Sequence, residues 1–208
     1  MRHLTVDLLD YLHKENKFKS SSWLFARDNI ELFAYSEIFT SAQCKTIIEI
    51  GKNCGLEKSL FGTASTYNED YRKSRNSWIT PADGNEWIFQ KLTDAAIYLN
   101  EKYFGFDLFG FTEGVQFTEY ESPGGKYAPH VDTMYKGSIR KLSITVQLSD
   151  ENDYEGGDVI CNYGSEMVMP RTQGIAIAFP SYALHGVKPI TKGTRYSLVA
   201  WITGPQFK

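Results

Sequence analysis

The spacing of apolar residues changes once along this chain, and that change limits the folds it can adopt. Between about Asn85 and Gly105 they recur every three or four positions, which predicts an amphipathic helix. Beyond Gly105 they alternate with polar residues in short segments separated by glycine-rich turns, which predicts antiparallel strands. The alternating segments are 115–120, 143–148, 175–179 and 195–202. Helices first and strands afterwards indicate an α+β, mainly β fold with the helices packed on one outer face of a sheet.

The first half of the chain carries further helical signals. Apolar residues at helical spacing in 4–12 predict a short opening helix. Thr40 and Gln43 have the spacing of a capping box, which predicts a second helix running to Gly55. Residues 62–77 hold almost no apolar side chain, so we expect a mobile loop there, of the kind that often forms a lid in an enzyme.

Length and composition suit one folded domain. A chain of 208 residues in which 42% are hydrophobic can bury a core of its own. We therefore expect a single domain over 1–208. Its mainly helical support region covers 1–105 and includes the polar loop at 62–77, and its β core covers 106–208.

Charge and cysteine content restrict the partners and the compartment. The 22 basic and 25 acidic residues give a net charge of −3, so no global field attracts the chain to nucleic acid or to an anionic membrane. Cys44, Cys54 and Cys161 are too few and too scattered for a disulfide scaffold, and we expect them to be reduced. The N-terminus does not read as a signal peptide, and no apolar run approaches the ~20 residues that cross a bilayer. We expect a soluble, cytoplasmic protein.

Two of the predicted strands have one polar face, which carries no charge in the segment 143–148. Ser143, Thr145 and Gln147 share one face of their strand, and Arg195 and Ser197 point to the same side of the last strand. If the apolar faces pack against helices, the polar faces line a ligand cavity inside a barrel. The simpler alternative is that they face solvent.

The histidines suggest a metal site. His130 and Asp132 are two residues apart, so on a strand their side chains project to one face, and His185 lies near the mouth of a late strand. Two imidazoles and one carboxylate form the donor set of non-haem Fe(II) oxygenases. The alternative is a histidine at a strand end and a surface aspartate that never meet.

Arg195 lies ten residues beyond His185, with Ser197 on the same strand face. A buried arginine requires an anion, and a dicarboxylate such as 2-oxoglutarate offers one with bidentate geometry. The alternative is a salt bridge at the rim. His-x-Asp, a second histidine about fifty residues later, and then arginine and serine together form a specific pattern.

These motifs resemble the 2-oxoglutarate/Fe(II)-dependent dioxygenases of the prolyl 4-hydroxylase type, and most closely the PKHD-type hydroxylases. The similarity covers most of the chain from Glu37 onwards. The matching segments are 39–44, 72–74 with Trp78, 103–108, 120–132, 142–150, 154–158 and 179–201. The resemblance implies a double-stranded β-helix, or jelly-roll, core over 106–208 that carries the metal and co-substrate site.

The resemblance also implies roles for individual residues. His130, Asp132 and His185 would hold the metal ion and form the catalytic centre. Arg195 would bind the distal carboxylate of 2-oxoglutarate, and Tyr120 matches a position whose hydroxyl helps to hold it. Some relatives carry a tyrosine where this chain has Gln147, whose amide is a candidate to bind a carboxylate instead. Ser197 would contact the co-substrate or leave room for it.

The activity implied is hydroxylation of an unactivated C–H bond, with Fe²⁺, 2-oxoglutarate and O₂ as cofactors and co-substrates, ascorbate as a candidate reductant, and release of succinate and CO₂. The resemblance favours a prolyl residue of a protein or peptide as the substrate. One alternative is a free amino acid or other small molecule with the same cofactors. Another is a non-catalytic jelly-roll binding module.

Overall fold

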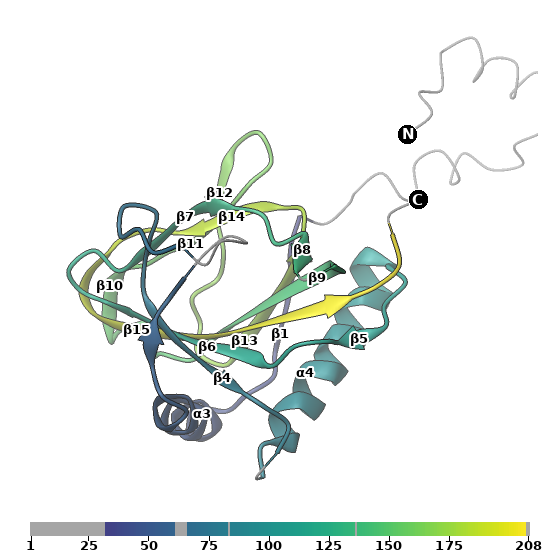
Figure 1. Cartoon of the computed structure of the whole chain (residues 1–208), viewed down its shortest axis with the longest axis horizontal. Helices are drawn as coiled ribbons and strands as arrows, with labels where there is room; N and C mark the ends of the chain where they lie inside the picture. The colour runs from purple at the N-terminus through teal and green to yellow at the C-terminus, as the bar shows by residue number, and fades with distance from the viewer. Residues whose placement is uncertain (1–31, 61–65, 83, 136, 207–208) are drawn as a thin grey trace, which may run out of the picture. The chain divides into compact units, whose positions relative to one another are not determined.

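The structure, a computed structural model, describes residues 32–60, 66–82, 84–135 and 137–206. Two antiparallel sheets face each other in these residues (Figure 1). The ten-stranded major sheet contains β1 (Ala34–Glu37), β2 (Glu57–Lys58), β4 (Arg75–Ile79), β5 (Gly110–Phe111), β6 (Val115–Glu121), β8 (Met134–Tyr135), β9 (Ser138–Gln147), β10 (Tyr154–Gly156), β13 (Ile175–Pro180) and β15 (Ile190–Thr203). The five-stranded minor sheet contains β3 (Arg72–Lys73), β7 (Lys126–His130), β11 (Val159–Asn162), β12 (Glu166–Val168) and β14 (Leu184–Val187).

The central strands alternate between the two sheets along the chain. From β6 the chain crosses to β7 and returns to β9, and after β11 in the minor sheet it passes through β13, β14 and β15 in the same way. This winding is that of a jelly roll. The four alternating segments of the sequence coincide with parts of β6, β9, β13 and β15, with only Leu148 lying beyond the end of β9, so their prediction as strands is confirmed.

Two helices cover the outer face of the major sheet, as predicted (Figure 1). Helix α3 (Ser41–Asn53) contacts β4 and β6, and α4 (Glu86–Leu99) contacts β1 and β13. The Thr40–Gln43 capping box starts α3. A π-helical turn, η1 (Asn100–Phe104), extends α4 to Gly105, whose φ of 66° ends the helix. No helix in the described residues is both long enough and apolar enough to span a membrane.

Parts of the expected N-terminal organisation are wrong. The predicted polar loop at 62–77 contains β3 and most of β4, which pair with β7 and β6. Sequence alone misses these strands because their stability comes from cross-strand partners and not from an apolar face of their own. The region expected to be mainly helical also contributes β1 and β2. The predicted opening helix at 4–12 lies outside the described residues.

The two faces of the major sheet have different surroundings. Ile144, Val146 and Leu198 point outwards and join the apolar core beneath the helices. The polar face of β9 and β15 points inwards to the space between the sheets, called the lumen below. Its side chains are all at most 6% exposed, so the solvent-facing alternative is wrong: they are Ser143, Thr145, Gln147, Arg195 and Ser197, and Gln116 and Thr118 on the adjacent β6 are equally buried.

The contact of α3 with β6 gives a first prediction. A β-carbon at Gly51 would lie 2.2 Å from Cγ of Phe117, a fully buried ring. Within a helix Gly→Ala normally stabilises, but here overpacking should dominate. Gly51→Ala is therefore expected to lower the free energy of unfolding by about 1–3 kcal/mol in urea denaturation. Glu49→Ala, on the exposed face of α3, should change it by at most about 0.5 kcal/mol.

Candidate active site

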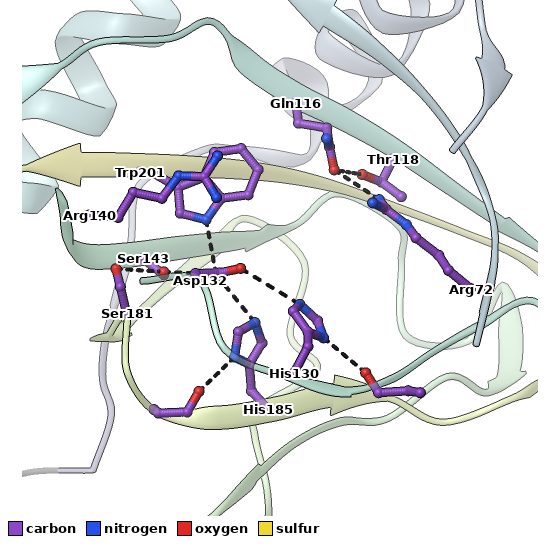
Figure 2. A network of polar contacts seen from close by, with 12 residues as sticks. Arg72, Gln116, Thr118, His130, Asp132, Arg140, Ser143, Ser181, His185 and Trp201 are labelled. Atoms are coloured by element: carbon purple, nitrogen blue, oxygen red, sulfur yellow. Dashed lines mark hydrogen bonds and ion pairs between the residues drawn. The ribbon is translucent and has the colours of Figure 1, made fainter. Parts of the chain in front are cut away.

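Three potential metal ligands from separate parts of the chain meet between the two sheets (Figure 2). His130 ends β7, Asp132 follows it by two residues, and His185 on β14 is the cross-strand partner of His130. Nε2 of His130 lies 3.7 Å from Oδ1 of Asp132, and Nε2 of His185 lies 3.4 Å from Oδ2. One donor atom of each lies within 4.8 Å of the other two. The alternative in which these residues never meet is therefore wrong.

Both imidazole rings are oriented by the same kind of backbone contact. Nδ1 of His130 lies 2.9 Å from the carbonyl oxygen of Ala128, and Nδ1 of His185 lies 2.9 Å from that of Ala183. Because a carbonyl oxygen only accepts hydrogen bonds, each Nδ1 carries the proton and each Nε2 presents a lone pair. Burial, together with the nearby His185, lowers the pKa of His130 to about 4, so its ring is neutral at pH 7. Neutral imidazole is the form that binds metal ions.

The carboxylate of Asp132 is fixed through one of its two oxygens. Ser143 Oγ and Trp201 Nε1 each donate a hydrogen bond of 2.9 Å to Oδ2, which directs Oδ1 towards His130. Burial opposes ionisation of this group, but His185, His130 and the indole N–H outweigh it, so the pKa of the Asp132 carboxyl lies below its usual value. The carboxylate is thus ionised and held in one orientation.

The indole that holds Asp132 lies against a buried ion pair. Cζ of Arg140 is 3.9 Å from the ring centre of Trp201, and Arg140 donates two hydrogen bonds, of 2.8 and 2.7 Å, to the carboxylate of Glu113. A cation over the face of an indole attracts its electrons and strengthens its N–H as a donor. Glu113, Arg140 and Trp201 therefore support the position of Asp132.

A second polar cluster surrounds Arg195, which is 1% exposed. Its Nε and Nη2 donate to Oε1 of Gln147 over 3.1 and 2.8 Å, and its Nη1 lies 3.5 Å from Oγ of Ser197. Tyr120 is its cross-strand partner, with the ring centre 5.5 Å from Cζ of Arg195. The structure thus brings together all four residues that the sequence associates with a co-substrate.

This cluster has an unmatched charge and an unmatched donor. Among the described residues no carboxylate lies within 4.0 Å of the Arg195 guanidinium, so the rim salt bridge is wrong. Nε2 of Gln147 is buried without a hydrogen-bond partner. Buried donors without partners are rare because each costs about 1–3 kcal/mol. An anion in the lumen would satisfy both groups.

Comparison with known proteins identifies a family to which the chain is similar. Residues 115–203 match the model of the 2OG-Fe(II) oxygenase superfamily. This segment therefore carries the sequence pattern of that superfamily. A PKHD-type hydroxylase of Picosynechococcus is 41% identical over 88 residues, which cover 41% of this chain and 40% of that protein. A PKHD-type hydroxylase of Prochlorococcus marinus is 32% identical over 141 residues, which cover 67% of this chain and 61% of that protein.

Solved structures of prolyl hydroxylases share the fold. A Pseudomonas putida prolyl-4-hydroxylase has a TM-score of 0.64 at 18% identity, with 84% of this chain and 94% of the other covered. A prolyl hydroxylase from Trichoplax adhaerens, in complex with a hypoxia inducible factor peptide fragment, has a TM-score of 0.69 at 13% identity, with 97% and 94% covered. For several of the curated relatives, by contrast, the match spans only about two fifths of their length.

The donor set fits the ferrous ion that the family implies. Metal bonds of about 2.1 Å that meet at 90–110° place their donor atoms about 3.0–3.4 Å apart. The two nitrogen–oxygen distances here, 3.7 Å to Oδ1 and 3.4 Å to Oδ2 of Asp132, lie at or just above that range, and one donor atom of each residue lies within 4.8 Å of the other two. The unmatched groups of Arg195 and Gln147 fit the dicarboxylate that the family implies.

Sequence reasoning missed the residues that orient Asp132. Trp201 shares a strand face with Arg195, but alternation does not reveal that its N–H points to a carboxylate. The roles of Arg140 and Glu113 depend on a pairing across 27 positions of the chain, which no local pattern encodes.

Loss of the indole N–H should weaken metal binding while leaving the ligands in place. Trp201→Phe is expected to reduce the affinity for Mn²⁺ or Co²⁺, measured by isothermal titration calorimetry, about 10- to 100-fold. The matched control is Trp78→Phe. The ring centre of Trp78 lies 6.1 Å from that of Trp201, but Trp78 is 41% exposed and makes no hydrogen bond to Asp132. Equal affinities in Trp201→Phe and the wild type would show that the indole does not position the carboxylate.

Proposed function

We propose that this protein is an Fe(II)- and 2-oxoglutarate-dependent dioxygenase that hydroxylates a prolyl residue of a protein or peptide, with release of succinate and CO₂. The observation that carries the proposal is the combination of two sites in one lumen. One is a cluster of two imidazoles and a carboxylate, and the other is a buried guanidinium without an acidic partner among the described residues. Either feature alone has simpler explanations, but together they match the requirements of a metal ion and a dicarboxylate.

In this proposal three side chains would hold the metal ion. His130, Asp132 and His185 would supply the three donors of the set that is typical of non-haem Fe(II) oxygenases. When bound, iron supplies the chemistry that couples oxidation of a C–H bond by O₂ to decarboxylation of 2-oxoglutarate. The contribution of the chain is to hold the donors in the right protonation state and to exclude water, since His185 and Asp132 are each at most 9% exposed.

The co-substrate would be held by its distal carboxylate. Arg195 offers charged N–H donors, and Gln147 adds the amide donor that lacks a partner. Tyr120 and Ser197 place hydroxyl groups beside them, because their strand positions face the same side of the sheet. These contacts fix the other end of 2-oxoglutarate relative to the histidines, and such positioning is a main contribution of a protein to catalysis.

The proposal of a prolyl substrate rests on the similar proteins. Prolyl hydroxylases are among the structures that share this fold, and one of them was solved with a peptide. A test is to incubate the protein with Fe(II), 2-oxoglutarate, ascorbate and proline-containing peptides, and to measure succinate and peptide mass. Peptide-dependent succinate and a gain of one oxygen on proline support the proposal. Turnover with free amino acids only would show that the substrate is a small molecule. A folded protein that forms no succinate under any of these conditions would favour a binding module.

Removal of the guanidinium should affect the co-substrate alone. Arg195→Ala is expected to weaken 2-oxoglutarate binding by about 2–4 kcal/mol, because charge-assisted hydrogen bonds in a buried site are lost. Calorimetric titration with 2-oxoglutarate in the presence of Mn²⁺ measures this, and the affinity for Mn²⁺ itself should be unchanged. Arg171→Ala, which removes an arginine already paired with Asp158, is the control. Unchanged co-substrate affinity in Arg195→Ala would contradict the assignment.

Removal of the carboxylate should affect the metal. Asp132→Ala is expected to lose bound iron on dialysis, because the negative charge that balances the ferrous ion is gone. Metal analysis after dialysis measures retention, and circular dichroism checks the fold. A variant that kept stoichiometric iron and turned over 2-oxoglutarate would refute the assignment of Asp132 as a ligand.

A further inference from the structure

The lumen contains a second buried guanidinium that the proposed function does not use. Arg72 lies on β3 opposite Tyr127 of β7, and it is 5% exposed. Its hydrogen bonds go to neutral acceptors: Nε donates to Ser74 Oγ over 2.9 Å, Nη2 to Gln116 Oε1 over 2.9 Å, and Nη1 to the carbonyl oxygen of Leu60 over 3.4 Å. A guanidinium has five N–H groups. Two of them therefore remain for a further acceptor.

Arg72 is separated from a proposed metal ligand by one aromatic ring. Its Cζ lies 4.4 Å from the ring centre of Tyr127, and the rings of Tyr127 and His130 are stacked with 3.6 Å between their centres. Figure 2 shows Arg72 entering from one side of the two imidazoles and Trp201 from the other. A group bound by Arg72 would lie close to the reacting centre but away from the ion pair above Trp201.

The positive charge of Arg72 has no acidic partner among the described residues. Two buried carboxylates on or beside β6 are already engaged, since Glu119 pairs with Arg75 and Glu113 with Arg140. No carboxylate within the described ranges lies within 4.0 Å of the Arg72 guanidinium. Burial of an unpaired charge is costly, and arginine does not release its proton. If Arg72 only linked β3 to Gln116 by a hydrogen bond, no charge would be required, because a neutral amide side chain could donate the same bond.

The charge balance of the proposed complex leaves room for one more anion. Arg72, Arg195 and a ferrous ion supply four positive charges, while Asp132 and 2-oxoglutarate supply three negative ones. Imidazoles that coordinate a metal ion do so without a charge of their own. One positive charge remains, and Arg72 is where it lies unpaired.

From this geometry we infer that Arg72 binds a carboxylate of the primary substrate, so that the preferred target is a prolyl group beside an acidic side chain or a chain terminus. The inference rests on the proposed function and adds to it the chemical class of the group that the substrate must carry. The carboxylate binds bidentately to the free N–H groups of Arg72. Arg72 is then a specificity-determining residue, distinct from the residues that bind the metal and the co-substrate.

The test uses matched ligands that differ in one charge. Binding to the whole protein loaded with Mn²⁺ and 2-oxoglutarate is measured by calorimetry without turnover. The ligands are acetylated, amidated tetrapeptides Ala-Glu-Pro-Ala and Ala-Pro-Glu-Ala, their Gln counterparts, and proline against prolinamide. The wild type should bind at least one carboxylate member about 10- to 100-fold more tightly than its neutral partner. The pair that shows the preference indicates whether Arg72 recognises the carboxylate of an acidic side chain or that of a chain terminus.

The variants assign the preference to Arg72. Arg72→Gln should lose it and keep the wild-type affinities for Mn²⁺ and 2-oxoglutarate, and Arg72→Lys should retain part of it. Lys73→Gln, which removes the adjacent charge bonded to the Pro123 carbonyl, should behave as the wild type. If Arg72→Gln does not fold, the inference is tested by the charge preference of the wild type and by its reduction in Arg72→Lys.

Three outcomes would overturn the inference: no charge preference in the wild type for any pair, an unchanged preference in Arg72→Gln, or a loss of 2-oxoglutarate affinity in that variant. The last would assign Arg72 to the co-substrate. Because the assay measures binding, it is independent of turnover. A preserved carboxylate preference without succinate formation would refute the proposed enzyme and leave the anion site intact.

Discussion

The pairing of β7 with β14 is the constraint on which the candidate active site depends. It places His185 directly opposite His130, although 55 positions separate them in the chain. The register shifts between His185 and Val187, and Gly186 lies at that irregularity. A β-carbon there would lie 2.9 Å from the carbonyl oxygen of Tyr127 and 3.2 Å from the nitrogen of Pro129. The absence of a side chain at Gly186 therefore lets the two strands approach closely enough for both rings to face one point.

Desolvation is the second constraint, because the lumen buries charge that the described residues do not balance. Asp132, Arg72 and Arg195 are each at most 8% exposed. Ionised groups in such surroundings cost several kcal/mol apiece unless they are paired and hydrogen-bonded. Ligands that bind only the folded state offset this cost through mass action. In the proposed function the charges of Asp132 and Arg195 would provide the affinity for a metal ion and a dicarboxylate, and by the further inference Arg72 would do so for an acidic substrate.

Sequence reasoning succeeded where a local pattern carries the information. Alternation identified the strands that hold Ser143 and Arg195, and the capping box identified the start of α3, because both patterns reflect period and hydrogen bonding over a few residues. The same reasoning failed for Arg72. It lies in a polar stretch without an apolar face, so its strand and its burial follow only from pairing with Tyr127. Trp201 and Glu113 were missed for the same reason, since their contacts join distant segments.

Gln147 illustrates how a departure from a family pattern acquires a physical meaning in the structure. Some relatives carry a tyrosine at about this place, whose hydroxyl supplies one donor. Here Oε1 of Gln147 accepts two hydrogen bonds from Arg195, which fixes the orientation of the amide, because the N–H₂ group cannot face the guanidinium donors. Nε2 therefore points away from Arg195 and is left without a partner. In the proposed complex Gln147 thus both orients the arginine and donates a hydrogen bond to the carboxylate. A tyrosine hydroxyl could do both only if its single proton pointed to the ligand. The amide uses one atom for each role, so neither role depends on the rotation of a hydroxyl group.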